Sequence, residues 1–162
     1  MIVIGIDPGT ATTGYGVIDE DNDGNFNVLD YGVVITRADL SLENRLKIIY
    51  DSLTSLIILH KPASAAVEKL FFKQNVTNAI SVGQARGVIL LAFANSGIPV
   101  AEYSPAEVKS AVSGYGGAEK AQVQAMVKAI LNLNETPKPD DAADALAIAL
   151  CHINSTGSLV NQ

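Results

Sequence analysis

The spacing of the hydrophobic residues predicts three strands at the start of the chain. Residues 2–6 are continuously apolar and mostly β-branched, which is typical of a strand buried on both faces. Strand-like segments follow over 14–19 and 26–36, and the polar cluster at 21–25 between them is typical of a hairpin turn. Because the links between the three segments are short, we expect them to pair antiparallel.

The spacing then changes to that of a helix. Apolar residues recur at helical spacing from Leu40 to His60, until Lys61-Pro62 ends the pattern. Two short apolar segments, 63–68 and 98–103, are predicted as strands. Further helices are predicted over 75–96, from the Ser104-Pro105 start signal to the glycine loop at 114–117, over 118–133 and over 140–154.

This order of elements predicts one α/β domain. A strand–helix–strand passage is a right-handed crossover between parallel strands, so the strand ending at Glu68 can run parallel to the one ending at Asp7. The chain shows neither an internal repeat nor a linker long enough to divide it. We expect a single domain over residues 1–154, followed by a loose polar tail over 155–162.

Carboxylates stand where this topology would bring them together. Asp7 and Glu68 close two strands at their carboxyl ends, where ligands of open α/β sheets gather. Asp141 and Asp144 are three residues apart near the start of the last helix, so we expect both to face one side. The rest of that helix is almost wholly Ala, Leu and Ile, which is typical of a deeply packed helix.

Each acid also has a structural explanation. Asp7 could cap the turn that follows it, and Glu68 could be a solvated strand end. Asp141 and Asp144, with Asp140 before them, could stabilise the helix N-terminus through capping and the helix dipole. That explanation suits Asp140 best, and whether Asp140 joins a site is left open by the sequence.

A shared site explains the acids more economically. Several carboxylates in one cleft raise one another's pKa unless a cation offsets them. Oxygen-only clusters select hard cations such as Mg²⁺ or Mn²⁺. Two such ions, on the order of 4 Å apart, stabilise the attacking and leaving oxygens in phosphoryl transfer, so we expect two ions in the site.

Five motifs in order resemble those of the RuvC-type Holliday junction resolvases, over about Met1 to His152. They are Gly5-Ile6-Asp7-Pro8-Gly9-Thr10, Ala66-Val67-Glu68-Lys69, Gln84-Ala85-Arg86-Gly87, Ala118-Glu119-Lys120-Ala121-Gln122-Val123 and Asp141-Ala142-Ala143-Asp144-Ala145-Leu146-Ala147. One short motif would carry little weight, but five in order with compatible spacing are specific.

The resemblance implies a ribonuclease H-like α/β fold, in which helices flank a five-stranded mixed sheet on both sides. It implies a homodimer that resolves four-way DNA junctions in homologous recombination and DNA repair. The two cuts would be symmetric and Mg²⁺-dependent, with Mn²⁺ able to substitute, and would leave 5′-phosphate and 3′-hydroxyl ends. Carried over by motif, the catalytic and metal-binding residues are Asp7, Glu68, Asp141 and Asp144. A branch-migration helicase complex of the RuvA–RuvB type is the implied protein partner.

Candidate DNA contacts lie between the second acid and the last helix. Phe71 and Phe72 follow Glu68, and adjacent strand residues point to opposite faces, so one ring could stack on an unpaired base. The resemblance favours Phe71, although both rings could instead pack under the next helix. Lys109 and Lys120 match family positions that contact DNA phosphates. Arg86, within its motif, is a further candidate.

A row of small residues predicts a close helix contact. Ala79, Gly83 and Gly87 are spaced by four, and small residues in one row let another helix approach at a cost in helix propensity. The partner could be a helix of the same chain, whereas the resemblance suggests the other subunit of a dimer.

The net charge of −6 is unusual for a protein that binds DNA. Residues 1–60 hold nine acidic residues against three basic ones, whereas residues 61–162 hold eight of each. The excess therefore lies in the first segment, and the four proposed metal ligands are part of the total. We expect DNA affinity that is modest and readily lost in salt.

Other classes are disfavoured. Hydrophobic residues make up 48% of the chain, so the chain as a whole is not a disordered acidic tail, and one Cys with two His cannot form a Cys-rich zinc site. No signal peptide and no unbroken apolar run long enough for a membrane span are visible, so we expect a cytoplasmic protein.

Two alternatives share features with the nuclease interpretation. The loop after the first strand also resembles the phosphate loop of the actin and Hsp70-like ATPases, but those proteins need two such domains and a second phosphate loop. A non-catalytic module that binds junctions is the remaining alternative, and it would not need all four acids.

Overall fold

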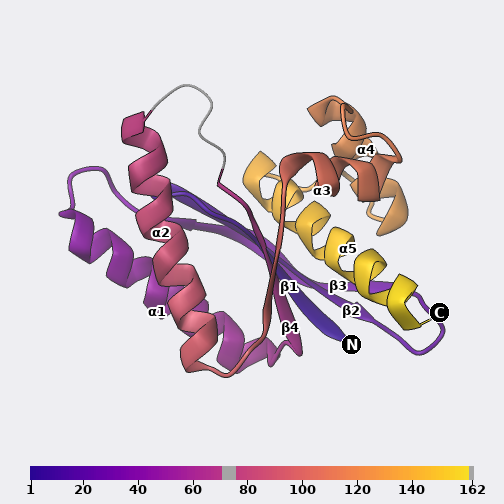
Figure 1. The fold of residues 1–162 in the computed structure, drawn as a ribbon, viewed down its shortest axis with the longest axis horizontal. Helices are drawn as coiled ribbons and strands as arrows, with labels where there is room; N and C mark the ends of the chain where they lie inside the picture. Colours follow the sequence, from indigo (N-terminus) through magenta and orange to yellow (C-terminus); the bar gives the residue numbers. More distant parts are fainter. Residues whose placement is uncertain (71–75, 161–162) are drawn as a thin grey trace.

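Five strands form one mixed sheet in the order β3-β2-β1-β4-β5 (Figure 1). In the computed structural model, which describes residues 1–70 and 76–160, the central strand β1 is Ile2–Asp7. It pairs antiparallel with β2 (Thr12–Glu20) and parallel with β4 (Ser64–Glu68), while β3 (Phe26–Ile35) and β5 (Val100–Tyr103) form the edges. The predicted antiparallel start and the predicted parallel crossover are both confirmed.

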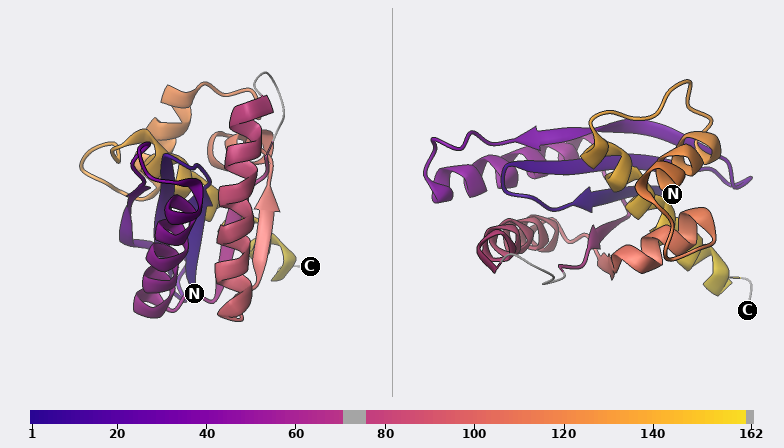
Figure 2. Two further views of the ribbon diagram at one scale, coloured as in Figure 1. Left: turned by 90° about the vertical axis from the view of Figure 1, so that its left-hand side faces the viewer. Right: turned by 90° about the horizontal axis from the view of Figure 1, so that it is seen from above.

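Helices cover both faces of this sheet (Figures 1 and 2). On one face lie α1 (Leu42–His60) and α2 (Val76–Asn95), which contact each other. On the other face α5 (Asp140–Val160) crosses β1 and β2. The two short helices α3 (Pro105–Ser113) and α4 (Lys120–Ile130) pack against the outer side of α5. The expected five-stranded mixed sheet with helices on both sides is confirmed.

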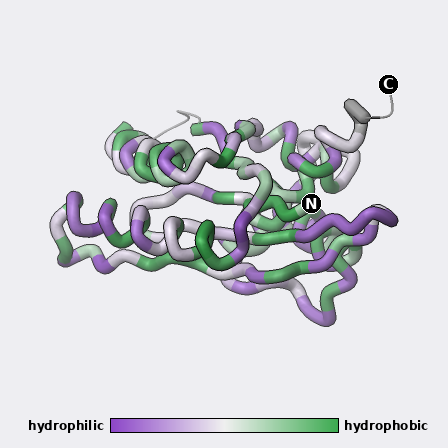
Figure 3. Tube along the Cα trace, turned by 90° about the horizontal axis from the view of Figure 1, so that it is seen from below, coloured by the Kyte–Doolittle hydropathy of each residue, from purple (hydrophilic) through white to green (hydrophobic). Residues whose placement is uncertain are grey.

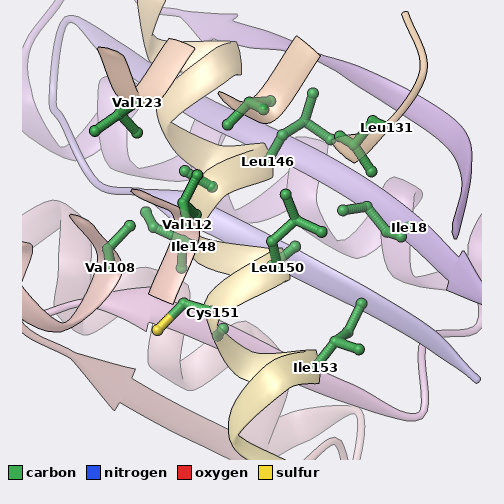
Figure 4. Close-up of a cluster of buried hydrophobic side chains, with 14 of the residues drawn as sticks. Ile18, Val108, Val112, Val123, Leu131, Leu146, Ile148, Leu150, Cys151 and Ile153 are labelled. Carbon is green, nitrogen blue, oxygen red and sulfur yellow. The ribbon is translucent and has the colours of Figure 1, made fainter. Parts of the chain in front are cut away.

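Each face of the sheet has its own hydrophobic core. Under α1 and α2, the core includes Ile4 and Ile6 of β1 together with Phe93 of α2. The opposite core is centred on α5, whose side chains meet Val108 and other residues of α3 and α4 (Figure 4). Coloured by hydropathy, the trace shows hydrophobic stretches along the strands and hydrophilic stretches at several of the loops (Figure 3).

The start of α3 follows its sequence signal. The Ser104 hydroxyl accepts a hydrogen bond from the Glu107 backbone amide at 3.2 Å, and the Glu107 carboxylate accepts one from the Ser104 amide at 2.7 Å. Pro105 occupies the first turn, where its missing N–H costs nothing. The helix ends at Gly114, which adopts a left-handed conformation with φ 77°.

The predicted loose tail is wrong for most of its length, because α5 continues to Val160 rather than ending at Asn154. The polar side chains that suggested a tail bond back into the helix. The Ser155 hydroxyl donates to the Cys151 carbonyl at 2.7 Å and the Thr156 hydroxyl donates to the His152 carbonyl at 3.0 Å. The predicted domain end at 154 therefore falls inside a helix, and the single domain stays a prediction.

α2 exposes an apolar stripe on the side away from the sheet. Val76, Ile80 and Leu91 have exposed fractions of 70%, 57% and 52%, and Gly87 lies between them on the same stripe. By length and composition alone α2 could cross a membrane, a weak indication because the core helices of globular proteins pass the same test. Of the small residues predicted to form a close helix contact, Ala79 is buried, whereas a Cβ atom at Gly83 would meet only the Leu70 side chain and one at Gly87 nothing within 4 Å, so the contact stays a prediction.

Candidate metal and DNA site

Asp7 and Glu68 lie at the carboxyl ends of two adjacent parallel strands. β1 and β4 pair up to Ile6 and Val67, and each acid is the next residue. Together with Asp144 of α5 they line a cleft of about 210 Å³, which we call the acid cleft. The prediction that these two strands place their acids at one edge of the sheet is therefore met by the geometry.

Glycines in the sheet bring α5 to this edge. A Cβ atom at Gly5 would lie 2.2 Å from the Ala145 carbonyl oxygen, and one at Gly14 would lie 2.0 Å from the Asp141 carbonyl oxygen. A Cβ atom at Gly16 would lie 2.8 Å from the Leu146 side chain and 2.9 Å from the Leu146 backbone nitrogen of the same helix. Only glycine lets the helix backbone lie directly on the strands, so these residues set the distance between the α5 acids and Asp7.

We did not select these glycines from the sequence, although a signal was present. Gly5, Gly14 and Gly16 stand inside predicted strands, where glycine is unfavourable unless another backbone approaches closely. In the antiparallel register Gly5 pairs with Gly16, and Asp7 pairs with Gly14. We call Gly5, Gly14 and Gly16 the glycine floor, because α5 lies directly on them. The glycine floor thus ends beside Asp7, the first catalytic candidate.

The acids share an unfavourable electrostatic field. Burial, with a further contribution from the carboxylates of Glu68, Asp144 and Asp141, raises the pKa of Asp7 to about 8. Burial is also the main cause that raises the pKa of Glu68 and of Asp144. The site therefore holds more negative charge than its own residues offset.

Two lysines reduce that charge from inside the cleft. The Lys120 ammonium lies 3.0 Å from an Asp144 carboxylate oxygen and 3.6 Å from one of Asp140. Lys109 also lines the cleft, and both lysines lower the pKa of Glu68. Their predicted role was phosphate contact. Their observed neighbours are the acids, which places any phosphate they contact at the acid cleft.

Asp141 and Asp144 do not line the same cleft, although the sequence predicts that they face one side. Asp144 lines the acid cleft, whereas Asp141 borders a second cleft on the other side of the loop that follows β1. Both still raise the pKa of Asp7 through their charge. Asp140 lies further out and pairs with Lys138 at 3.1 Å, as suits a residue at the start of a helix.

The donor set suits a hard divalent cation. All four candidates offer carboxylate oxygens. Burial, and after it the neighbouring carboxylates, raises the pKa of Asp7, Glu68 and Asp144, and a bound divalent cation would offset both causes. Within residues 1–70 and 76–160, no three His, Cys, Asp or Glu side chains are grouped closely enough to hold a metal as they stand. Asp144 is instead paired with the Lys120 ammonium.

The other DNA-contact candidates are placed less directly. Arg86 pairs with Glu102 of β5, and it borders a small cleft beside Glu68. Its guanidinium thus ties α2 to the sheet, and its predicted contact with DNA stays a prediction. Phe71, with Phe72, lies outside the described residues.

Comparison with known proteins identifies the family. The sequence model of the family described as crossover junction endodeoxyribonuclease RuvC matches residues 3–152. The chain belongs to this family. The enzymes of that name from Fusobacterium nucleatum and Caldicellulosiruptor saccharolyticus are 54% and 49% identical to it. Those alignments cover 98% and 100% of this chain and 83% and 98% of the relatives.

Solved RuvC structures share the fold. A Thermus thermophilus RuvC structure has a TM-score of 0.91 and 38% identity. A structure described as T. thermophilus RuvC in complex with Holliday junction substrate has a TM-score of 0.89 and 35% identity. Each alignment covers 98% of this chain and 96% of the other. The predicted ribonuclease H-like class is confirmed, and the protein is a member of a family of nucleases that depend on divalent metal ions.

Proposed function

We propose that this RuvC family member resolves four-way DNA junctions by hydrolysing two phosphodiesters symmetrically. The observation that carries the proposal is the acid cleft, where Asp7, Glu68 and Asp144 meet two lysines at the edge of the sheet. A module that only binds junctions has no need of a buried carboxylate whose pKa is raised by burial and by neighbouring carboxylates. The relative whose structure is described with a Holliday junction substrate supports the choice of substrate.

We assign Asp7, Glu68, Asp141 and Asp144 as the ligands of Mg²⁺, with Mn²⁺ as a substitute and two ions per site. A bound divalent cation supplies charge stabilisation at the phosphate and lowers the pKa of the attacking water. Asp7 and Glu68 hold their carboxylates on rigid strand ends, so their positions change little during the reaction. Lys109 and Lys120, at the same cleft, are placed to attract the phosphate that the acids alone would repel. The products are a 5′-phosphate and a 3′-hydroxyl.

We propose a homodimer that forms through the exposed stripe on α2. Val76, Ile80 and Leu91 are large apolar side chains left in solvent by the single chain. A second copy that packs the same stripe against the first would cover both, which is the geometry of a two-fold interface. Gly83 and Gly87 beside the stripe would let the two helices approach closely. Each subunit would then cut one strand of the junction.

The remaining assignments rest on the family resemblance. We propose a cytoplasmic role in homologous recombination and DNA repair, together with a branch-migration helicase complex of the RuvA–RuvB type. Phe71 is proposed to stack on a base near the crossover. Residues 1–154 are proposed to form the nuclease domain, with α5 extending beyond them.

A junction cleavage assay tests the function. The four strands of a synthetic junction are labelled in turn and incubated with the purified protein in Mg²⁺, in Mn²⁺ and in EDTA. Paired nicks at equivalent positions are expected with either metal and none in EDTA. Shifted mobility of the junction without scission would instead support the binding module.

Asp7→Asn tests the assignment of the acids. The substitution removes one proposed metal ligand and one buried negative charge, so cleavage should fall by at least about 10³-fold while junction binding persists. Asp51→Asn is the matched control, because Asp51 lies on α1 and, among the described residues, forms its ion pair with Lys47. Wild-type cleavage rates in the Asp7 variant would contradict the assignment.

A further inference from the structure

A second cleft lies on the other side of the loop that follows β1. Its volume is about 490 Å³, and its lining is mostly hydroxyl and small side chains, with a single carboxylate, that of Asp141. Thr10 and Ser81 contribute hydroxyls, Asn78 an amide and Arg45 a guanidinium. We call it the Arg45 cleft.

Arg45 is held in place by a chain of hydrogen bonds. Its Nε donates to the Thr36 hydroxyl oxygen at 2.9 Å, and the Thr36 hydroxyl donates to the Thr10 carbonyl at 2.5 Å. The Thr10 hydroxyl in turn donates to the Ser81 carbonyl at 2.8 Å. These bonds connect α1, the end of β3, the loop after Asp7 and α2, so the guanidinium is fixed relative to the acid cleft.

Arg45 also differs from the other arginines in its ion pairing. The other two arginines of the chain pair with carboxylates, Arg37 with Asp39 and Arg86 with Glu102. Among the residues that the structure describes, no carboxylate lies within ion-pair distance of Arg45. A fixed guanidinium that lines a polar cleft without an acidic partner is well suited to bind a phosphate.

The position of the cleft suggests which phosphate it would hold. Thr10 follows Asp7 by three residues, a reach of at most about 10 Å along an extended chain. Asp141 borders the Arg45 cleft while its charge acts on Asp7, so the two clefts adjoin at the start of α5. Because Asp141 would repel an anion, the phosphate is expected at the Arg45 end of the cleft.

We propose that the Arg45 cleft binds a backbone phosphate of the strand being cut, within a few nucleotides of the phosphate that is hydrolysed. This rests on the proposed function and adds to it a contact that aligns the strand in the acid cleft. Arg45 supplies the charge, and the Thr10, Ser81 and Asn78 side chains supply the polar lining. The four acids and the lysines of the acid cleft act on the scissile phosphate itself.

The first test compares two charge removals on α1. Junction binding is measured in EDTA over a range of salt for the wild type, Arg45→Gln and Lys47→Gln. Lys47 is two residues away, exposed, and paired with Asp51. Arg45→Gln should weaken binding about threefold to tenfold and lower the salt slope by about one, as for the loss of one phosphate contact. Lys47→Gln should change neither. Equal effects of the two substitutions would overturn the proposal.

The second test locates the phosphate. Single neutral methylphosphonates are placed in turn at each position around the cut site. At one position near the scissile phosphate, the methylphosphonate should lower the affinity of the wild type for the junction. The same methylphosphonate should not lower the affinity of Arg45→Gln. If the glutamine variant does not fold, Arg45→Lys replaces it. Lysine keeps the positive charge but loses the hydrogen bond that Nε donates. The methylphosphonate at that position should then lower the affinity of Arg45→Lys less than it lowers the affinity of the wild type. Identical position profiles for wild type and variant would overturn the proposal.

The outcomes separate this proposal from the proposed function. If the wild type cuts junctions and Arg45→Gln behaves as Lys47→Gln does, only the Arg45 contact is wrong. If the wild type binds junctions in these assays without cutting them, the proposed hydrolysis is wrong while the binding profiles still decide the Arg45 contact. Failure of the wild type to bind any junction would overturn both.

Discussion

α5 and α2 are similar in length and apolar content but have very different surroundings. Both are long, apolar helices, and α2 holds a single charged residue, Arg86. Yet α5 is buried from Ala142 to Ile153 apart from its Asp144 position, whereas α2 keeps a row of large apolar side chains in solvent. Composition alone does not distinguish them.

The difference comes from what lies on each side of the helix. α5 is held between the glycine floor of β1 and β2 and the two helices α3 and α4. α2 is covered by α1 and the sheet on one side only, and within the described residues no element covers the other. A helix enclosed on all sides can hold catalytic acids at fixed positions, and a half-covered helix offers a surface for a partner.

The strongest test of this comparison is Gly5→Ala. The added methyl group would meet the Ala145 carbonyl and the Ala149 amide, and neither belongs to a flexible side chain. α5 would have to move away from the sheet, so we expect a loss of more than about 3 kcal/mol in the free energy of unfolding. Urea denaturation measures it. A loss below 1 kcal/mol would show that α5 does not depend on the glycine floor.

The second test places a charge on the open stripe of α2. Leu91→Glu should leave the fold intact but convert the proposed dimer into monomers in sedimentation experiments at micromolar concentration, because a carboxylate would be buried between two copies. Paired cutting of a junction should become independent nicking. Leu59→Glu is the matched control, since Leu59 is an exposed leucine on α1. A dimer that survives Leu91→Glu would contradict the α2 interface.

The third test concerns the charged end of α5 and its neighbour Asp7. The pKa of this acid is about 8 in the folded chain and near 3.8 when unfolded. Between these values the unfolded chain has released a proton that the folded chain retains, so the metal-free stability falls as the pH rises. Asp7→Asn lacks this penalty and should be more stable than the wild type by roughly 1–3 kcal/mol at pH 8, but not at pH 4.

Urea denaturation in EDTA at several pH values measures this difference. Added Mg²⁺ should stabilise the wild type at pH 8 and have a smaller effect on the variant. A wild-type stability that rises from pH 5 to 8 while that of Asp7→Asn stays level would contradict the raised pKa.

The smallest expected effect is that of Gly87→Ala. A Cβ atom here meets nothing within 4 Å in the single chain, so the helix should gain about 0.5–1 kcal/mol from alanine's higher propensity. Unfolding at a concentration below dimerisation measures the gain. The same methyl group should weaken the dimer if the α2 helices pack closely. Compared with Gly5→Ala, this result would show that Gly5 is required for packing within one chain and Gly87 for packing between two copies.

Much of the fold could be predicted because its signals are local. The alternation and length of apolar runs locate β1 and β3, and the Ser104-Pro105 signal marks the first turn of α3. The end of α5 could not be predicted in this way. Ser155 and Thr156 indicate a tail when only composition is considered, but in the structure their hydroxyls bond within the helix.

The sequence predicts which residues form the candidate site better than it predicts how those residues are arranged. The strand ends and the family motifs select Asp7 and Glu68, and the parallel pairing of β1 and β4 brings them together. That Asp141 borders a different cleft from Asp144 depends on how α5 is rotated against the sheet. No sequence signal indicates the Arg45 cleft, because Arg45 lies far from most of its lining residues along the chain and is not part of a recognised motif.

The sequence by itself determined the order of the elements, the acids that the chemistry requires and the family to which the chain belongs. These depend on residue identities and short spacings, which do not change on folding. The tertiary structure decided which lysines sit among the acids, which arginine is left without a carboxylate and which face of an apolar helix stays open. Those depend on distances between segments remote in sequence, and such distances are set only when the glycine floor, the two cores and the helices pack together.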